Sequence, residues 1–284
     1  MPIAQYKKFV RAMVTVGSYC EDPATRAHYW EQIVTPLLQR LNAVVALPPS
    51  ERHRDEVRQE LCYVVAGLIG TAMSSNSKTA ATLYEKIGKF VGDCGGILDA
   101  YHNYDEIVEL CLEFITEVGR RSLSYLSHAD SIKLYEGAMS VVKSYALHAT
   151  GRRNFERTAE EDAYNDLVLL LDMLNCLLTK DFLDLSPEAV NDGLTPPISA
   201  AEVSLQGLSI VMPFMNAELL QYPNLSSKYF RLVAFVTELH AEKVVNLPAG
   251  MVQALFESVQ LGLQTSTTEG FTSCCEFVMV SLHT

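Results

Sequence analysis

The sequence predicts an all-α protein, an α-solenoid built from HEAT-like antiparallel helix pairs. Apolar residues recur every three or four positions along almost the whole chain, which is the spacing of one helix face. The 284 residues include only 15 glycines and 11 prolines, fewer than the frequent turns of an all-β protein require. Helix-start signals recur so that pairs of helices repeat at roughly 50-residue intervals, close to the HEAT and armadillo range.

The helices follow from these apolar stripes. The clearest stripe runs from Ala80 to Tyr101, where apolar residues are separated by steps of three, four and one. Applied along the chain, the same pattern predicts helices at 4–19, 23–46, 51–73, 77–101, 104–126, 129–149, 159–180, 200–217, 225–240, 248–263 and 267–282.

Several residues mark helix ends. Asp22-Pro23 and Leu247-Pro248 place proline at a first helical position. Pro36 and Pro213 fall inside predicted helices and are expected to kink them. Three capping boxes predict helix N-termini, at 158–161 (TAEE), 199–202 (SAAE) and 266–269 (STTE).

Five consecutive pairs and one leftover helix, about five and a half pairs, predict a single solenoid domain over 1–284. One pair cannot bury both of its apolar faces, whereas stacked pairs form a continuous core. Glycines inside helices then predict close packing of helix backbones; for Gly92, Gly95 and Gly96 the alternative is the close approach of a partner. These glycines are Gly67, Gly70, Gly88, Gly92, Gly95, Gly96, Gly137 and Gly207.

Composition limits the partners and the compartment. With 34 acidic residues against 22 lysines and arginines, the formal charge is −12, which argues against nucleic acid or an anionic membrane surface as a partner. No signal peptide and no apolar run of about twenty residues is visible in the sequence. The 7 cysteines show no C-x-x-C spacing, so we expect reduced thiols in a soluble intracellular protein.

Signatures of enzyme chemistry are absent from the sequence. It contains no Gly-x-Ser-x-Gly elbow, no phosphate-binding glycine loop and no His-Glu-x-x-His motif. No two of the 7 histidines are spaced i, i+3 or i, i+4, so no helical metal site is predicted. Acids at 160–162 are better explained by a helix N-terminus than by a magnesium cluster. We expect no catalytic residue, metal or cofactor; an all-α lyase is a distant alternative.

Surface charge is the remaining functional signal. In a solenoid one helix of each pair lines the concave side, which such proteins use for partners. The predicted second helices carry acids, and Glu85, Lys89 and Asp93 form one ridge at i, i+4 and i+8. This surface would steer a basic protein toward it; the alternative is a solvated face that keeps the chain soluble. The candidate cargo-binding residues are Glu31, Glu85, Asp93, Asp99, Asp130 and Glu136.

Three segments resemble a known family. They are 29–40 (YWEQIVTPLLQR), 151–153 (GRR) followed by 158–167 (TAEEDAYNDL), and 199–203 (SAAEV) continuing to Tyr229. In order and spacing they are similar to the exportin-4 family of the importin-β (karyopherin) superfamily of nuclear transport receptors. The resemblance extends from about Lys8 to the end of the chain and contains no catalytic motif.

The resemblance implies HEAT repeats, binding of Ran in its GTP state, and export of folded protein cargo, notably the hypusine-bearing translation factor 5A. It also implies contact with nucleoporins and shuttling between nucleus and cytoplasm through the nuclear pore. The family is several times longer, and this chain resembles its C-terminal portion without the principal N-terminal Ran surface. As a truncated solenoid it would leave the helix at 267–282 without a partner helix. The alternative function is a generic HEAT-repeat scaffold or adaptor subunit of a larger complex.

Overall fold

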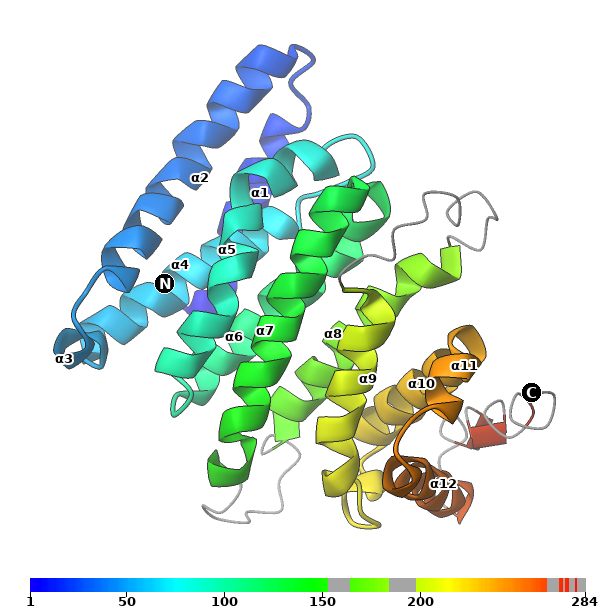
Figure 1. Ribbon diagram of the computed structural model, residues 1–284. Helices are drawn as coiled ribbons and strands as arrows, with labels where there is room; N and C mark the ends of the chain where they lie inside the picture. The colour runs from blue at the N-terminus through cyan, green and yellow to red at the C-terminus, as the bar shows by residue number, and fades with distance from the viewer. Residues whose placement is uncertain (153–163, 184–197, 265–270, 273, 276–278, 280–284) are drawn as a thin grey trace. The chain divides into compact units, whose positions relative to one another are not determined.

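A computed structural model of the chain describes residues 1–152, 164–183, 198–264, 271–272, 274–275 and 279 (Figure 1). Within these residues the regular structure is helical throughout, with no strand, so the predicted fold class is confirmed. The chain divides into two compact units, Met1–Phe155 and Glu156–Thr284, which are described separately below. The single continuous domain over 1–284 stays a prediction.

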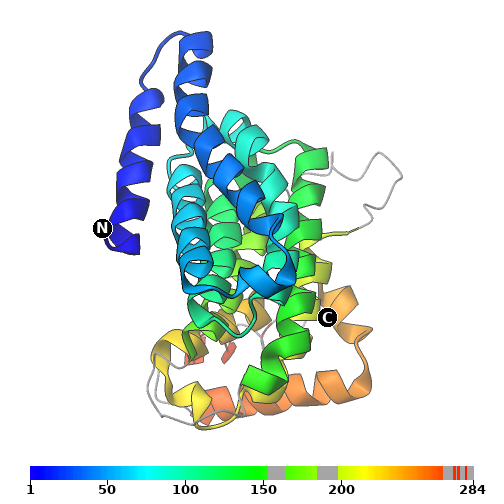
Figure 2. The ribbon, with the colours of Figure 1, turned by 90° about the vertical axis from the view of Figure 1, so that its left-hand side faces the viewer.

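The first unit contains three helix pairs. The first helices of the pairs are α1 (Ile3–Gly17), α4 (Asp55–Ala72) and α6 (Asp105–Ser122), and α4 packs between the other two (Figure 1). The second helices are α2 (Pro23–Val45), α5 (Ala80–Ala100) and α7 (His128–Arg152). Figure 2 shows α1 and α2 as a hairpin joined at one end, as expected for one unit of a helical repeat.

Close backbone approach holds the first helices together. A methyl group added at Gly70 of α4 would lie 2.5 Å from the Lys7 carbonyl oxygen of α1. One turn further along, the Ser74 hydroxyl donates to the Arg11 carbonyl at 3.0 Å. The prediction that glycine permits close helix packing is therefore confirmed at Gly70, and it is also confirmed at Gly67, whose added methyl would lie 2.9 Å from the Leu37 side chain.

The second helices α5 and α7 run parallel and in tight contact. The Tyr84 hydroxyl near the start of α5 donates to the Asp130 carbonyl near the start of α7 at 3.1 Å. A methyl group added at Gly137 would lie 2.6 Å from the Val91 carbonyl oxygen. The neighbouring second helix, α2, instead packs mainly on α4 and touches α5 only sparsely.

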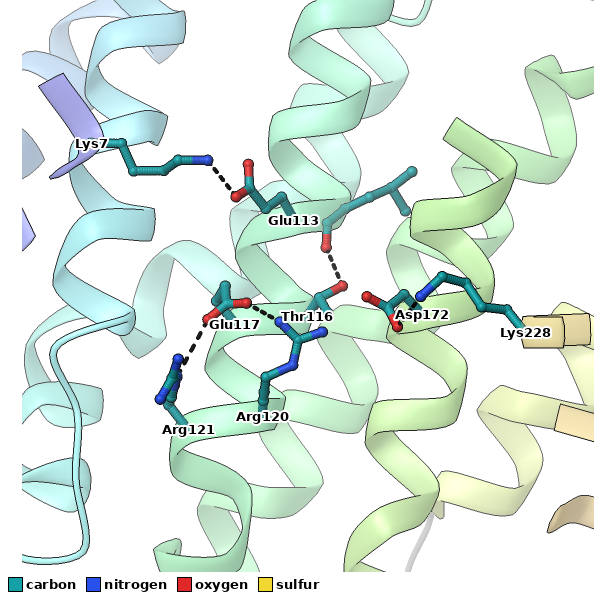
Figure 3. Close-up of polar contacts among 9 residues, drawn as sticks. Lys7, Glu113, Thr116, Glu117, Arg120, Arg121, Asp172 and Lys228 are labelled. Carbon is teal, nitrogen blue, oxygen red and sulfur yellow. Dashed lines mark hydrogen bonds and ion pairs between the residues drawn. The ribbon is translucent and has the colours of Figure 1, made fainter. Parts of the chain in front are cut away.

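The second unit repeats this plan with α8 (Asn165–Leu183), α9 (Ala200–Val211), α10 (Pro223–Leu239), the short α11 (Ala241–Val245) and α12 (Ala249–Gln264). Lys228 of α10 pairs with Asp172 of α8 at 2.8 Å (Figure 3). The buried Tyr229 hydroxyl of α10 donates to Ser258 of α12 at 2.8 Å. At Gly207 of α9 the space is occupied by the Leu174 side chain of α8 rather than by a neighbouring backbone.

Several predicted helix ends are confirmed. Asp22 caps α2 by accepting from the Thr25 amide at 2.8 Å, with proline at the first helical position. The capping box before α9 is complete, because Ser199 and Glu202 each accept from the other's backbone amide. The capping boxes at 158–161 and 266–269, and most of the helix predicted at 267–282, lie outside the described residues.

Two helix predictions were wrong in extent. The helix predicted at 200–217 ends at Val211 and continues as a short 3-10 turn containing Pro213, because proline has no amide hydrogen to continue the α-helical pattern. The helix predicted at 51–73 is instead the four-residue α3 (Pro49–Arg52) followed by α4. Pro36 lies inside α2, as predicted.

Candidate functional site

All six predicted acids lie on the second helices of the first unit. Glu31 is on α2, Glu85, Asp93 and Asp99 are on α5, and Asp130 and Glu136 are on α7. Four of them are exposed, and Asp93 and Asp130 are half-buried. We call the solvent-facing side of α2, α5 and α7 the second-helix face.

Three of the six carboxylates already have a partner within the protein. Glu31 lies 3.2 Å from the Lys86 ammonium, and Asp99 lies 2.7 Å from His148 Nε2. Asp130 lies 3.0 Å from Lys133 and accepts from the Ser127 hydroxyl at 2.7 Å. The Ser127 hydrogen bond, aided by Lys133, lowers the pKa of Asp130. These three acids are therefore already engaged by side chains of the protein itself.

The other three, Glu85, Asp93 and Glu136, have neither a hydrogen bond nor an ion pair to another described residue. They lie on the two helices that pack tightly together, α5 and α7. The structure thus places all six acids on the second helices and leaves half of them available as free carboxylates.

A cavity of about 320 Å³ lies beside Asp93, between the end of α2 and the second half of α5. A methyl group added at Gly92 or Gly96 would have no heavy atom within 4 Å, so both glycines face open space. The prediction that these two residues serve packing inside the protein was wrong, because α2 does not approach α5 here. Packing is confirmed at Gly95, where an added methyl would lie 2.7 Å from Ser140 Cβ of α7. The cavity is lined by Val45, Arg52, Gly92, Asp93, Gly96, Ile97, Ala100 and Tyr101.

Two polar residues, Tyr101 and Arg52, are among those that line this cavity. Tyr101 is 3% exposed, and its hydroxyl has no hydrogen-bond partner among the described residues. Burial raises the pKa of Tyr101, although the nearby Arg52 guanidinium opposes the shift. Arg52 in turn donates to the carbonyls of Leu47 at 2.7 Å and Val45 at 3.2 Å. The helical pattern placed Tyr101 at the end of the apolar stripe but gave no sign of its unpaired hydroxyl, which appears only in three dimensions.

Sequence reasoning also missed a pair of histidines. The rings of His102 and His148 stack at 3.7 Å between centroids, and His148 contacts Asp99. The two histidines are far apart along the chain, so the search at helical spacing could not find them. No group of three or more residues suited to holding a metal ion occurs among the described residues.

Several carboxylates of the first helices are instead bound within the protein. Lys7 of α1 reaches Glu113 of α6, and Glu117, which is 5% exposed, contacts both Arg120 and Arg121 (Figure 3). Such groups are already satisfied and have little to offer a ligand.

None of the seven cysteines forms a disulfide, as predicted from their spacing. Burial raises the pKa of Cys62 to about 12, which keeps its thiol protonated and unreactive. In the part of the chain that the structure describes, no helix is both long and apolar enough to cross a bilayer.

The family model described as Exportin-4 matches residues 2–283. Exportin-4 of Dictyostelium discoideum is 18% identical over 265 residues, covering 90% of this chain. The chain spans 22% of the length of that relative. With the family match over nearly its whole length, the chain belongs to the exportin-4 family, a family of nuclear transport receptors.

Proposed function

We propose that this chain is part of a nuclear export receptor and that its second-helix face binds a basic protein cargo. The observation that supports this most strongly is the set of three free carboxylates on α5 and α7, Glu85, Asp93 and Glu136. Carboxylates that have no partner within their own protein gain most from a cation supplied by another.

Electrostatics supports the same assignment at longer range. The formal charge of −12 attracts a positively charged protein before contact. Exposed charge pairs are each weak and are screened by salt, with a Debye length of about 8 Å at physiological ionic strength. We therefore expect cargo binding to weaken as salt rises, and to depend on several acids together.

Membership of the exportin-4 family supports a proposal for the cargo and for control by Ran. We infer binding of cargo together with Ran-GTP, contact with nucleoporins, and shuttling between nucleus and cytoplasm through the nuclear pore. The hypusine-bearing translation factor 5A is the first cargo to examine, since hypusine is a long cationic side chain that suits a face with free carboxylates. Because this chain spans 22% of the relative's length, the rest of a receptor would contribute to Ran binding.

A matched pair of triple variants tests the cargo face. E85Q/D93N/E136Q removes the three free carboxylates of the second-helix face. E21Q/E218Q/E238Q removes three exposed acids elsewhere that have no ion pair among the described residues. Both variants have the same net charge, so long-range attraction is equal and only the position of the acids differs.

Affinity for hypusine-bearing translation factor 5A would be measured by calorimetry at low and physiological salt. We expect the first variant to bind about tenfold more weakly than wild type, as the loss of three modest charge pairs implies. The control variant should bind within about twofold of wild type. Equal affinity of the two variants would contradict the assignment of the face.

Dependence on Ran separates a receptor from a generic HEAT scaffold. In a chain that includes the preceding repeats, cargo capture should require Ran loaded with GTP and fail with Ran loaded with GDP. Capture that is indifferent to Ran would favour the scaffold.

A further inference from the structure

One side of α1 carries an exposed row of apolar side chains. Phe9, Met13 and Val16 follow one another at i, i+4 and i+7, and their exposed fractions are 54%, 37% and 59%. We call these three residues the α1 ridge. Isolated exposed apolar residues are normal, but a contiguous row on one helix face marks an interaction surface. Tyr19, which is 82% exposed, lies just beyond the end of the helix.

The packing of the other first helices indicates that a helix suits the ridge. α2 packs on α4 more extensively than on α1, and α5 packs on α6 more extensively than on α4. Each of these second helices therefore covers the first helix of the next pair. Within the described residues no second helix covers α1 in this way, and Figure 2 shows α1 at one edge of the first unit. A helix with its own apolar residues at i, i+4 and i+7 would match the ridge.

The charge beside the ridge specifies that helix further. Lys8 and Arg11 are exposed, and their side chains have neither a hydrogen bond nor an ion pair to another described residue. α1 contains no acidic residue, although the whole chain has a formal charge of −12. The first acids in the sequence are Glu21 and Asp22, and Asp22 is already engaged in capping α2. The exposed side of α1 is thus a basic and partly apolar surface on an acidic protein.

We propose that the α1 ridge binds an amphipathic α-helix of a partner protein, with apolar residues against the ridge and acidic residues against Lys8 and Arg11. Unpaired cations beside an apolar surface favour a partner that supplies carboxylates as well as apolar side chains. A second copy of α1 does not fit, because two copies would bring like charges together. An anionic membrane is disfavoured by the negative charge of the rest of the chain.

This inference goes beyond the cargo proposal and uses a different surface. The second-helix face is assigned to basic cargo through its acids, whereas the α1 ridge lies at the edge of the other layer and selects an acidic helix through its cations. Probes of opposite charge therefore test the two proposals, and failure of one leaves the other standing.

The probe is a fluorescently labelled synthetic peptide of about 14 residues, about 21 Å long when helical, and a hydrocarbon staple on its solvent side holds it helical. It carries leucines at i, i+4, i+7 and i+11, with glutamates on one flank of this row. A second peptide has lysine at every glutamate position. Binding to the full chain is followed by fluorescence anisotropy, and amide hydrogen exchange in α1 locates it.

Two double variants of equal net charge test the cations. K8E/R11E reverses the pair beside the ridge. K89E/K143E is the control, because Lys89 of α5 and Lys143 of α7 are exposed lysines whose side chains have no partner among the described residues. We expect the acidic peptide to protect α1 of wild type from exchange and to bind K8E/R11E about tenfold more weakly. The control should lose less than about threefold.

Reversed charges should restore binding, and removal of the ridge should prevent it. The lysine peptide should protect α1 of K8E/R11E but not α1 of wild type. F9S/V16S, which replaces two exposed residues of the ridge, should abolish binding of the acidic peptide, while its helix content by circular dichroism stays at the wild-type level.

Three results would overturn the proposal. The first is the absence of binding by the acidic peptide up to about 1 mM. The second is an equal loss of affinity in K8E/R11E and K89E/K143E, since binding through overall charge would not distinguish these positions. The third is that wild type dimerises in sedimentation, or binds phosphatidylserine vesicles, and that F9S/V16S abolishes this, because the ridge would then belong to a second copy or to a membrane.

Discussion

The two helix layers of the first unit contain glycines and glutamates in opposite surroundings. In the layer of α1, α4 and α6, Gly70 is closed by a neighbouring backbone, and Glu117 is bound by two arginines. In the layer of α2, α5 and α7, Gly96 faces open space, and Glu85 has no partner among the described residues.

This difference separates stability from binding within one repeat. We call a glycine closed when a neighbouring backbone leaves no room for a side chain, and open when nothing lies near it. A closed glycine and a paired carboxylate already make their contacts within the protein, so replacing them mainly affects folding. An open glycine and a free carboxylate contribute little to folding, and their replacement should mainly affect partners. The following predictions use matched residues from the two layers to test that division.

The largest difference is expected between two glycines. Gly70→Ala places a methyl 2.5 Å from the Lys7 carbonyl oxygen, and this overpacking should lower the free energy of unfolding by about 2–3 kcal/mol. Gly96→Ala meets nothing and should raise it by about 0.5–1 kcal/mol through better helix propensity. Urea denaturation followed by circular dichroism measures both. Equal effects would remove the distinction between closed and open glycines.

Two glutamates should differ somewhat less. Glu117→Ala removes a carboxylate that is 5% exposed and bound by two arginines, so we expect a loss of about 2 kcal/mol. Glu85→Ala should change the free energy of unfolding by less than about 0.5 kcal/mol, as an exposed site without contacts does. The same denaturation series checks this. A destabilising Glu85→Ala would mean that the second-helix face also contributes to stability.

Two tyrosines extend the comparison: Tyr84 lies near the start of α5, and Tyr101 directly follows its last residue. Tyr84 donates to the Asp130 carbonyl, so Tyr84→Phe should lower stability by about 1 kcal/mol. The buried Tyr101 hydroxyl has no partner in the described structure, so Tyr101→Phe should leave stability unchanged or raise it by up to about 1 kcal/mol. Thermal denaturation of the two variants gives the sign of each change in stability. Destabilisation by Tyr101→Phe would show that the hydroxyl has an acceptor inside the protein.

The smallest effect is a pH dependence. Arg40 of α2 donates to Glu60 of α4 at 2.8 Å and lowers the pKa of Glu60 below 4.5. A carboxyl whose pKa is lower in the folded state stabilises the fold above the unfolded-state pKa, and the contribution is lost as pH falls through the folded-state value. Stability should therefore fall less steeply below about pH 4.5 in Glu60→Gln than in wild type. Urea denaturation at a series of pH values below 5 measures how steeply the free energy of unfolding falls with pH. Glu85→Gln is the control and should follow wild type.

Most of the fold could be predicted from local pattern. The apolar stripe from Ala80 to Tyr101 predicted α5, which is observed at Ala80–Ala100. Asp22-Pro23 correctly predicted the start of α2. The errors have local physical causes, such as the end of α9 before Pro213.

The candidate site was less accessible to sequence reasoning. Helical periodicity identified which acids lie on the second helices, but not that Lys86 and His148 reach Glu31 and Asp99 from other helices. The same limit applies to Gly95 and Gly96, which are adjacent in sequence yet differ completely in surroundings, because α7 packs on one and nothing packs on the other. Pairing and open space depend on how neighbouring helices diverge, and that is a tertiary property.

The central claim is that the second helices of the first unit are the binding layer, and amide hydrogen exchange with and without hypusine-bearing translation factor 5A tests it most directly. The claim predicts slower exchange in α5 and α7 on addition of this cargo, with α4 and α6 unchanged. Protection confined to α4 and α6 would contradict it.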